Sequence, residues 1–402
     1  MTQAPPEKPR HNQEPGSEVA KLRMENAQLR HQRTMLGKKD AIIAMLRKDM
    51  SQISKELAYH KSLWDEDVLA RGGDARYMHS QSVINAVMAN KKLVPHITHH
   101  SVEQLEYMYR RAEDAVRRDG SRLFYENGDP RPGNRARLTV RQSVFVSVTR
   151  KAGDLRQADF VMLLGVSQST VSQCIAYIDP ILEGVLPTAK RVQEAVRDAA
   201  TEDELEELVP DGTITPDGTE TPIQRPGNYD VQKEYYSGKK KRHTVKNTII
   251  VNKEQLILYA GRAHPGKIHD LKMLQEDDPD LGIITQTLKS ADEPPKEIQI
   301  LVFSDMGYKK IQEMYPGGTH KQPHKRPKDG RLTNRQKQDN KSIGRRRVHV
   351  EHAIGKLKRY RILGRPFDGT IEEFDLAMSV ITGLANLKTL WNHKKKKPRR
   401  EF

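Results

Sequence analysis

The hydrophobic pattern of this chain changes near residue 205, and that change limits the choice of fold more than any other feature. Upstream of it, apolar residues recur at helical spacing. Downstream come short β-branched or apolar runs at 244–251, 255–260 and 297–304, which are typical of strands, and the first two predict a hairpin. We therefore expect a multidomain protein of class α plus α/β, with helical modules first and a mixed α/β domain at 205–392.

Positive charge is in excess along the chain. Its 402 residues include 69 Lys and Arg against 53 Asp and Glu, a formal net charge of +16. Dense cationic runs occur at Lys239–Arg242, Arg345–Arg347 and Lys394–Arg400. A solvated basic surface would account for some of this charge, but the excess favours binding to a polyanion, most simply a nucleic acid.

The sequence also bounds the compartment. Cys174 is the one cysteine, so the chain cannot form an internal disulfide, and a reducing compartment is expected. No apolar run approaches the roughly 18 residues that span a bilayer, and the N-terminus lacks the apolar core of a secretory signal. We expect an intracellular protein without a membrane partner, in the nucleus of a eukaryote or the cytoplasm and nucleoid of a prokaryote.

The first sixty residues divide into two segments. Residues 1–16 are rich in Pro and charge and are predicted to be disordered. Residues 17–60 carry apolar side chains every seven residues, at Leu22, Leu29, Leu36, Ile43, Met50 and Leu57. This spacing predicts a coiled coil and a homo-oligomer, in which the polar Asn26 would fix the register. The alternative is a long amphipathic helix packed on its own domain.

Residues 61–135 are expected to be a helical and linker region. The stretch Ser101–Arg118 predicts an amphipathic helix with Ser101 as its N-cap. Three histidines within 96–100 precede it and could form a metal site, although the lack of cysteine and of regular ligand spacing favours a polar loop. The turn-rich, basic stretch at 126–137 is a plausible linker.

A second helical module is predicted at 136–190 and ends at two prolines, Pro180 and Pro187. Helices at 139–149 and 155–164, a turn at Gly165–Ser167 and a polar helix at 168–178 have the layout of a helix-turn-helix. Many such helix pairs never touch DNA, but the charge of the chain favours DNA binding here. The polar helix would then present five side chains to base edges or phosphates, namely Gln168, Ser169, Thr170, Ser172 and Gln173.

Further elements complete the expected organisation. One helix is predicted at 191–207, another from His269-Asp270 to about Gln275, a long polar loop at 315–346 and an amphipathic closing helix at 371–390. The last residues, 393–402, form a basic tail in which Lys394–Arg400 is almost wholly cationic. This tail would serve as a nuclear localisation signal or as a clamp on phosphate.

The most unusual stretch of the α/β domain is Gly344–Arg361. On a helix with about 100° per residue, one stripe is apolar and a neighbouring strip is polar. The stripe holds Val350, Ala353, Ile354 and Leu357, and the strip holds Arg347, Glu351 and Lys358. Glu351 could merely relieve repulsion among the bases by pairing with Arg347 one turn away. Alternatively, it is a metal ligand on a rigid element, with cations around it for phosphate.

Two more acids favour the metal-ligand interpretation of Glu351. Asp217 lies in a strand that we expect before the hairpin, and Asp305 follows the apolar run at 297–304. Acids at strand ends face the crevice where α/β sheets bind ligands, and three converging carboxylates suit Mg²⁺ or Mn²⁺. A pair of such ions could activate an oxygen nucleophile and stabilise the leaving oxygen at phosphorus. With a basic surface around the site, a phosphodiester is the expected substrate.

These residues belong to a wider set of motifs that resembles a known family. The motifs are Asp217-Gly218-Thr219-Glu220 with Ile223–Pro226, Tyr235–Thr244, Pro265-Gly266 with His269-Asp270-Leu271, Asp305–Tyr308, Leu332-Thr333, and Arg347–His352 with Ile354-Gly355 and Lys358. Over 216–390 the chain resembles DDE transposases of the PIF/Harbinger superfamily and the related bacterial insertion-sequence group. The family has an Arg four residues before the Glu and a Lys seven after it, matched by Arg347 and Lys358, but a Tyr where this chain has Gly344.

The resemblance implies an RNase H-like fold for 205–392, with Asp217, Asp305 and Glu351 as the catalytic and metal-binding triad. It implies two divalent ions, Mg²⁺ or Mn²⁺, as cofactors. The partner would be DNA, both the terminal inverted repeats of a transposon and the target DNA. The reaction would be cleavage of the transposon ends, followed by strand transfer through the freed 3′-hydroxyl.

Some assignments within this set have alternatives. Asp211, in an earlier Pro-Asp-Gly-Thr copy, competes with Asp217, although the longer match downstream favours Asp217. Asp270 could be a metal ligand, but its place at a helix start suggests an N-cap, with His269 near the phosphate. Two tyrosines that could stack on unpaired bases precede the turn of Lys239, Lys240, Lys241 and Arg242. DNA contact by this turn is therefore favoured over a solvated hairpin face.

Two rival functions fit the same sequence. A domesticated protein could bind DNA on this scaffold without cutting it, and a metal-dependent cleavage assay on a terminal inverted repeat would separate the two. A zipper-type transcription regulator could use residues 18–60 and 138–186, with a structural C-terminal half. Deletion of 205–402 would leave part of a regulator's activity and none of a transposase's.

Overall fold

The computed structural model describes residues 84–396 of the 402, except 86, 90, 120–137, 154, 200–201, 280–286, 289–295, 298–299, 315–317 and 329. Several predicted segments lie outside the described residues: the disordered N-terminus at 1–16, the coiled coil at 17–60, the linker at 126–137 and the end of the cationic tail. None of the described helices is long and apolar enough to cross a membrane.

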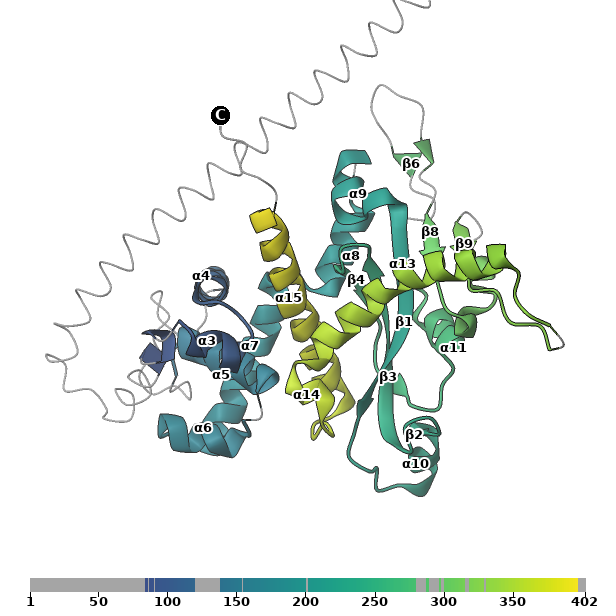
Figure 1. Cartoon of the computed structure of the whole chain (residues 1–402). Coiled ribbons are helices and arrows are strands. Elements are labelled where there is room, and N and C mark those ends of the chain that lie inside the picture. The colour runs from purple at the N-terminus through teal and green to yellow at the C-terminus, as the bar shows by residue number, and fades with distance from the viewer. Residues whose placement is uncertain are drawn as a thin grey trace, which may run out of the picture. The chain divides into compact units, whose positions relative to one another are not determined.

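Helices make up the first half of the described chain (Figure 1). They include α3 (Leu93–Thr98), α4 (Val102–Arg118), α5 (Val140–Ala152), α6 (Gln157–Leu164), α7 (Gln168–Val185), α8 (Ala189–Arg197) and α9 (Glu202–Leu208). Hydroxyl caps fix where four of them begin, because Ser101, Thr139, Ser167 and Thr188 each accept a hydrogen bond from a backbone N–H of the first turn. The helix predicted at 101–118, with its Ser101 cap, is thus confirmed.

Two helix boundaries in this half differ from the prediction. α7 continues through Pro180 to Val185. The side chain of Pro180 is exposed to solvent, while Leu182 and Val185 are buried in the core. A proline thus interrupts one helical hydrogen bond without ending the helix, since tertiary packing outweighs that loss. The single helix predicted at 191–207 is two helices, α8 and α9.

One sheet organises the second half, which confirms the predicted change from helices to a mixed α/β arrangement. Its strands are β1 (Thr213–Pro222), β2 (Tyr236–Ser237), β3 (Arg242–Asn252), β4 (Ile257–Ala260), β5 (His264–Pro265), β8 (Leu301–Phe303) and β9 (Thr319–Lys321). Strands β2, β4 and β5 share one edge of β3, and β1, β8 and β9 follow in that order on its other side. β3 is antiparallel to β1 and β4, which confirms the predicted hairpin, whereas β8 is parallel to β1 and β9.

Further elements accompany this sheet. They are a separate pair of strands, β6 (Thr287–Leu288) and β7 (Lys296–Glu297), and the helices η1 (Pro210–Gly212), α10 (Tyr229–Tyr235), α11 (Asp270–Asp277), η2 (Met306–Tyr308), α12 (Ile311–Met314), α13 (Asn334–Lys358), α14 (Arg361–Gly364) and α15 (Ile371–Lys396). α11 begins as predicted near residue 270, and α15 extends beyond the predicted end at residue 390.

The prediction of a long polar loop at 315–346 is wrong. Strand β9 lies within it, and α13 begins there, where Thr333 and Gln336 form a capping box. Ile343 is the one buried residue of this helix before Val350, so the first turns of α13 are polar on nearly every side. A helix with so little apolar surface has no periodic signal in its sequence.

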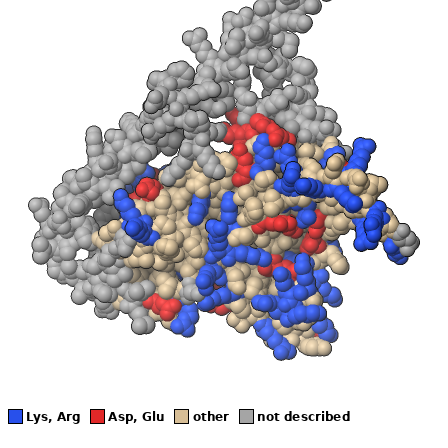
Figure 2. Space-filling model, in the orientation of Figure 1, with Lys and Arg blue, Asp and Glu red and all other residues tan. Residues whose placement is uncertain are grey.

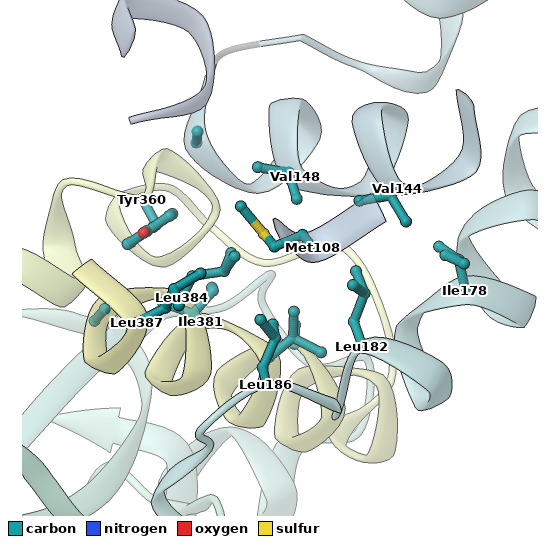
Figure 3. Close-up of a cluster of buried hydrophobic side chains, with 14 of the residues drawn as sticks. Met108, Val144, Val148, Ile178, Leu182, Leu186, Tyr360, Ile381, Leu384 and Leu387 are labelled. Atoms are coloured by element: carbon teal, nitrogen blue, oxygen red, sulfur yellow. The ribbon is translucent and has the colours of Figure 1, made fainter. Parts of the chain in front are cut away.

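α15 joins the helices of the first half to the sheet. It packs against α7 and α8 on one side and β4 on the other, and Figure 3 shows its Ile381, Leu384 and Leu387 beside Leu182 and Leu186 in a continuous apolar cluster. Its buried Asn386 fixes this position through the backbone of its neighbours. The amide accepts from Ile257 N at 2.8 Å and donates to Ile257 O at 2.9 Å and Pro187 O at 3.0 Å.

Candidate active site

Two aspartates stand at matching positions on neighbouring parallel strands. Ile214 of β1 pairs with Val302 of β8, and Asp217 and Asp305 each lie three residues further along. Asp217 is still inside β1, whereas Asp305 follows β8 and caps η2 by accepting a hydrogen bond from Gly307 N at 2.7 Å. The strand register therefore brings both carboxylates to the same end of the parallel pair.

The carboxyl of Asp217 is electrostatically strained by this arrangement. Burial, together with the carboxylates of Asp305 and Asp270, raises the pKa of Asp217 to about 6, against the lowering effect of the Gly218 N–H and the Arg347 guanidinium. Gly218 N donates to Asp217 Oδ1 at 2.8 Å. A divalent cation would relieve the repulsion between the acids, and carboxylate oxygens are the ligands that Mg²⁺ and Mn²⁺ prefer. The donor set at this point thus fits such an ion.

α13 lies against β1 and β3 and carries three of the predicted site residues (Figure 1). Its apolar stripe is buried as predicted at Val350, Ala353 and Leu357, while Ile354 is partly buried. This packing explains why the adjacent polar strip is held beside the sheet, because the helix cannot rotate without exposing the stripe.

Two cations of that strip act on Asp217. Arg347 lowers the pKa of Asp217, as noted above. Burial and the charge of Lys240 lower the pKa of Lys358, and Glu220 and Asp217 oppose that shift. Arg347 and Lys358 stand one turn before and two turns after residue 351, so the charge of Asp217 interacts with both ends of the strip.

Glu351 stands on the strip between these cations, but its side chain is exposed. In the part of the chain that the structure describes, no three His, Cys, Asp or Glu side chains are grouped closely enough to hold a metal ion. The structure therefore brings Asp217 and Asp305 together and leaves the carboxylate of Glu351 apart from them.

Asp270 is engaged by a lysine that the sequence did not single out. Lys246 Nζ lies 3.2 Å from Asp270 Oδ1, donates to Ile268 O at 2.9 Å and lies 3.9 Å from Glu220. The N-cap position of α11 belongs to His269, whose exposed side chain makes no capping bond, so the N-cap prediction for Asp270 is wrong. Lys246 and Glu220 are cross-strand partners in β3 and β1. Their opposite charges were the available sequence signal, although it requires knowing the register.

The basic turn joins β2 to β3 and is exposed at all four predicted positions, Lys239, Lys240, Lys241 and Arg242. Ser237 shapes it, because its Oγ accepts from Lys240 N at 3.1 Å and its carbonyl from Lys241 N at 2.8 Å. Tyr236, 43% exposed, lies beside the turn with its ring edge-on to His243. Figure 2 shows Lys and Arg gathered over this end of the sheet, next to a patch of acidic side chains.

The predicted DNA-reading helix is the first half of α7, and Gly165, in the left-handed conformation at φ 65°, makes the turn before it. Four of its five predicted DNA contacts are exposed, namely Gln168, Ser169, Ser172 and Gln173. Thr170 is the exception. It is buried, with its hydroxyl 2.9 Å from Ser167 Oγ, so this side chain does not face solvent and is removed from the predicted contacts.

Of the three histidines before α4, His96 is exposed and His100 is part of the packed core. His100 is buried, with Nε2 2.9 Å from the Tyr360 hydroxyl and Nδ1 3.3 Å from Gln104 Oε1. Burial, with a contribution from the charge of Lys388, lowers the pKa of His100 to about 3, so the ring is neutral at physiological pH. The ring of His100 therefore serves as a hydrogen-bonding group of the core. Neither the polar loop nor the metal site considered for these histidines predicts this role.

The site residues fall within a segment that matches a known family. Residues 216–386 match the family described as DDE superfamily endonuclease. This segment is thus similar to DDE superfamily endonucleases. Over 262 residues the chain is 26% identical to the protein named "Probable transposase for insertion sequence element IS702" from Microchaete diplosiphon, and the match covers 65% of this chain and 85% of that protein. No solved structure matches significantly. The segment that matches the family begins one residue before Asp217 and includes Asp305 and Glu351.

Proposed function

We propose that this protein is a DNA transposase that cuts transposon ends by metal-dependent phosphodiester hydrolysis and joins the freed 3′-hydroxyl to target DNA. The observation that carries the proposal is the in-register pair Asp217 and Asp305, two mutually repelling carboxylates inside the segment that matches the endonuclease family. The strand order β4-β3-β1-β8-β9, antiparallel on one side of β1 and parallel on the other, supports the RNase H-like fold expected from the resemblance.

The proposed metal ligands are Asp217, Asp305 and Glu351, which would hold two Mg²⁺ or Mn²⁺ ions. When bound, these ions would supply the activated oxygen nucleophile and stabilise the leaving oxygen. The side chain of Glu351 is exposed on α13, and this helix packs against β1, the strand that carries Asp217. In this proposal a change of rotamer turns the Glu351 carboxylate toward the aspartates.

The chain's cations would hold the DNA around this site. Arg347 and Lys358 of α13 are the cations whose charges interact with Asp217 of β1. In this proposal they contact the phosphates next to the scissile bond. His269 is exposed at the start of α11 and could add a contact to the same strand. The turn of Lys239, Lys240, Lys241 and Arg242 would bind the backbone farther along, and Lys240 is close enough to lower the pKa of Lys358.

The helical half would supply sequence recognition and assembly. α6 and α7 would act as a helix-turn-helix that reads a terminal inverted repeat through Gln168, Ser169, Ser172 and Gln173. The segment 17–60 would join copies of the chain as a coiled coil, so that both transposon ends are held together. We propose an intracellular location, at the DNA of the host.

Cleavage of a terminal inverted repeat with its flanking DNA, with and without Mg²⁺, tests the proposal. Asp217→Asn, Asp305→Asn and Glu351→Gln should each abolish cleavage and leave binding of the DNA end largely intact, because charge at the metals is lost while the fold stays. Asp211→Asn is the matched control, since Asp211 lies in the same Pro-Asp-Gly-Thr sequence but is exposed and paired with Lys253. Retained cleavage in Glu351→Gln would remove it from the triad. Binding without any cleavage by the wild type would favour the non-cutting DNA-binding protein.

A further inference from the structure

Tyr308 is a buried tyrosine whose hydroxyl has no hydrogen-bond partner among the described residues. Its side chain is 0% exposed, and the hydroxyl oxygen is fully enclosed. It lies on η2, three residues after Asp305, where η2 packs against α11. Buried hydroxyls nearly always have a partner, because leaving one unpaired loses the hydrogen bonds that water would make. This orphan hydroxyl therefore calls for an explanation.

The groups around Tyr308 are those of the candidate active site. Burial raises the pKa of Tyr308 well above its usual value, the carboxylates of Asp217, Asp270 and Asp305 raise it further, and Arg347 opposes them. Arg347 Nε is also buried without a partner. Two buried donors without a partner thus belong to residues on which the charges of this site act.

Each of the three acids can accept one more hydrogen bond. Lys246 binds Asp270, Gly307 N binds Asp305 and Gly218 N binds Asp217, in each case at Oδ1, which leaves Oδ2 for another donor. Among the three acids, the charge of Asp217 acts most strongly on Tyr308.

We propose that Tyr308 is a positioning residue that orients Asp217 for metal binding, by donating its hydroxyl to this carboxylate when a divalent cation draws the acids together. The inference rests on the proposed metal-dependent function and assigns it a residue beyond the triad. Carboxylates that bind metals are themselves held by hydrogen bonds, and loss of such a partner typically weakens metal affinity by about 10–100-fold. Metal binding would then give the Tyr308 hydroxyl the acceptor that it lacks among the described residues.

The test is Tyr308→Phe, which removes the hydroxyl and keeps the ring. Mn²⁺ alone is titrated into the full chain and free Mn²⁺ is followed by electron paramagnetic resonance, so that the readout is binding rather than activity. We expect Mn²⁺ affinity to fall by about 10–100-fold. In the metal-free protein the urea midpoint should stay the same or rise, because the substitution deletes an unpaired buried hydroxyl.

Tyr360→Phe is the matched control. Tyr360 is equally buried, but its hydroxyl is 2.9 Å from His100 Nε2, away from the acids. This variant should lower the urea midpoint, because it leaves a buried ring nitrogen unpaired, and should leave Mn²⁺ affinity unchanged. The two variants should therefore give opposite results: Tyr308→Phe changes Mn²⁺ affinity without lowering the urea midpoint, and Tyr360→Phe lowers the urea midpoint without changing Mn²⁺ affinity.

Two results would overturn the inference. Unchanged Mn²⁺ affinity in Tyr308→Phe, or a lower metal-free midpoint, would show that the hydroxyl serves the fold and not the metal. Asp217→Asn separates this failure from failure of the proposed function. If Asp217→Asn binds Mn²⁺ as tightly as the wild type, the metal site itself is refuted, and the positioning role falls with it. If Asp217→Asn loses binding while Tyr308→Phe retains it, the inference about Tyr308 alone is refuted.

Discussion

Asp217→Asn should stabilise the metal-free protein at neutral pH even though it destroys the proposed activity. Burial and the neighbouring carboxylates of Asp305 and Asp270 raise the pKa of Asp217 from 3.8 to about 6. A shift of about 2 units corresponds to about 3 kcal/mol at roughly 1.4 kcal/mol per unit. Asparagine carries no charge and can still accept the Gly218 N–H, so it escapes this penalty. We treat about 3 kcal/mol as the upper value, because Asp217 is partly open to water.

The effect has a definite pH dependence. The folded protein holds the Asp217 proton more tightly than the unfolded chain, so the stability of the wild type falls as pH rises from about 4 to about 6. Below pH 4 both states are protonated and the variant should gain nothing. Above pH 6 the gain should be complete, and it should be constant to pH 8.

Urea unfolding in EDTA at several values between pH 4 and pH 8, followed by circular dichroism, measures this difference. Adding Mg²⁺ should then stabilise the wild type and not Asp217→Asn, since a ligand raises stability only where it binds the folded state. Asp211→Asn should show neither the gain nor the loss of the Mg²⁺ effect, because Asp211 is exposed. An Asp217→Asn protein no more stable than the wild type at pH 7.5, or a gain independent of pH, would refute the claim that this carboxyl is strained.

Two further predictions concern DNA binding and the helical half. Replacing Lys239, Lys240, Lys241 and Arg242 by alanine should weaken binding to duplex DNA. If all four side chains contact phosphates, the slope of log affinity against log salt should fall by about 3–4. An unchanged slope in a filter-binding titration would remove this turn from the interface. Lys151→Met should destabilise the protein by about 3–5 kcal/mol, because it leaves Asp179 buried without the lysine that lies 2.6 Å away. The double variant Lys151→Met/Asp179→Leu should recover most of that loss in urea unfolding, whereas an additive loss would show that the pair is not coupled.

The features that the sequence reveals are those with a local signal. Ser101 announces its helix because a capping side chain acts within one turn. The apolar stripe of α13 follows from helical periodicity, because this helix buries one face. Asp217 was predicted in one strand and Asp305 at the end of another, but the parallel pairing that brings the two strands together had no local signal.

The features that sequence analysis missed depend on contacts far along the chain. Lys246 meets Asp270 only after β3 and α11 fold together, and Tyr308 is enclosed by elements that no local pattern connects to it. Thr170 has the composition of a DNA contact, but the turn of the helix points it inward. The same holds for Pro180, whose ability to stay inside α7 depends on the burial of the residues around it.

The hydrogen bonds of Asn386 have a consequence for how the protein is made. The amide of Asn386 joins α15 to the backbone of β4 and of Pro187. Both of these segments are synthesised long before α15, so they lack these hydrogen bonds until Asn386 has been added. While a ribosome is still adding α15, the contacts of this helix with α7, α8 and β4 are missing. The sheet that carries Asp217 and Asp305 therefore lacks one of its packing partners until residue 386 has left the ribosome.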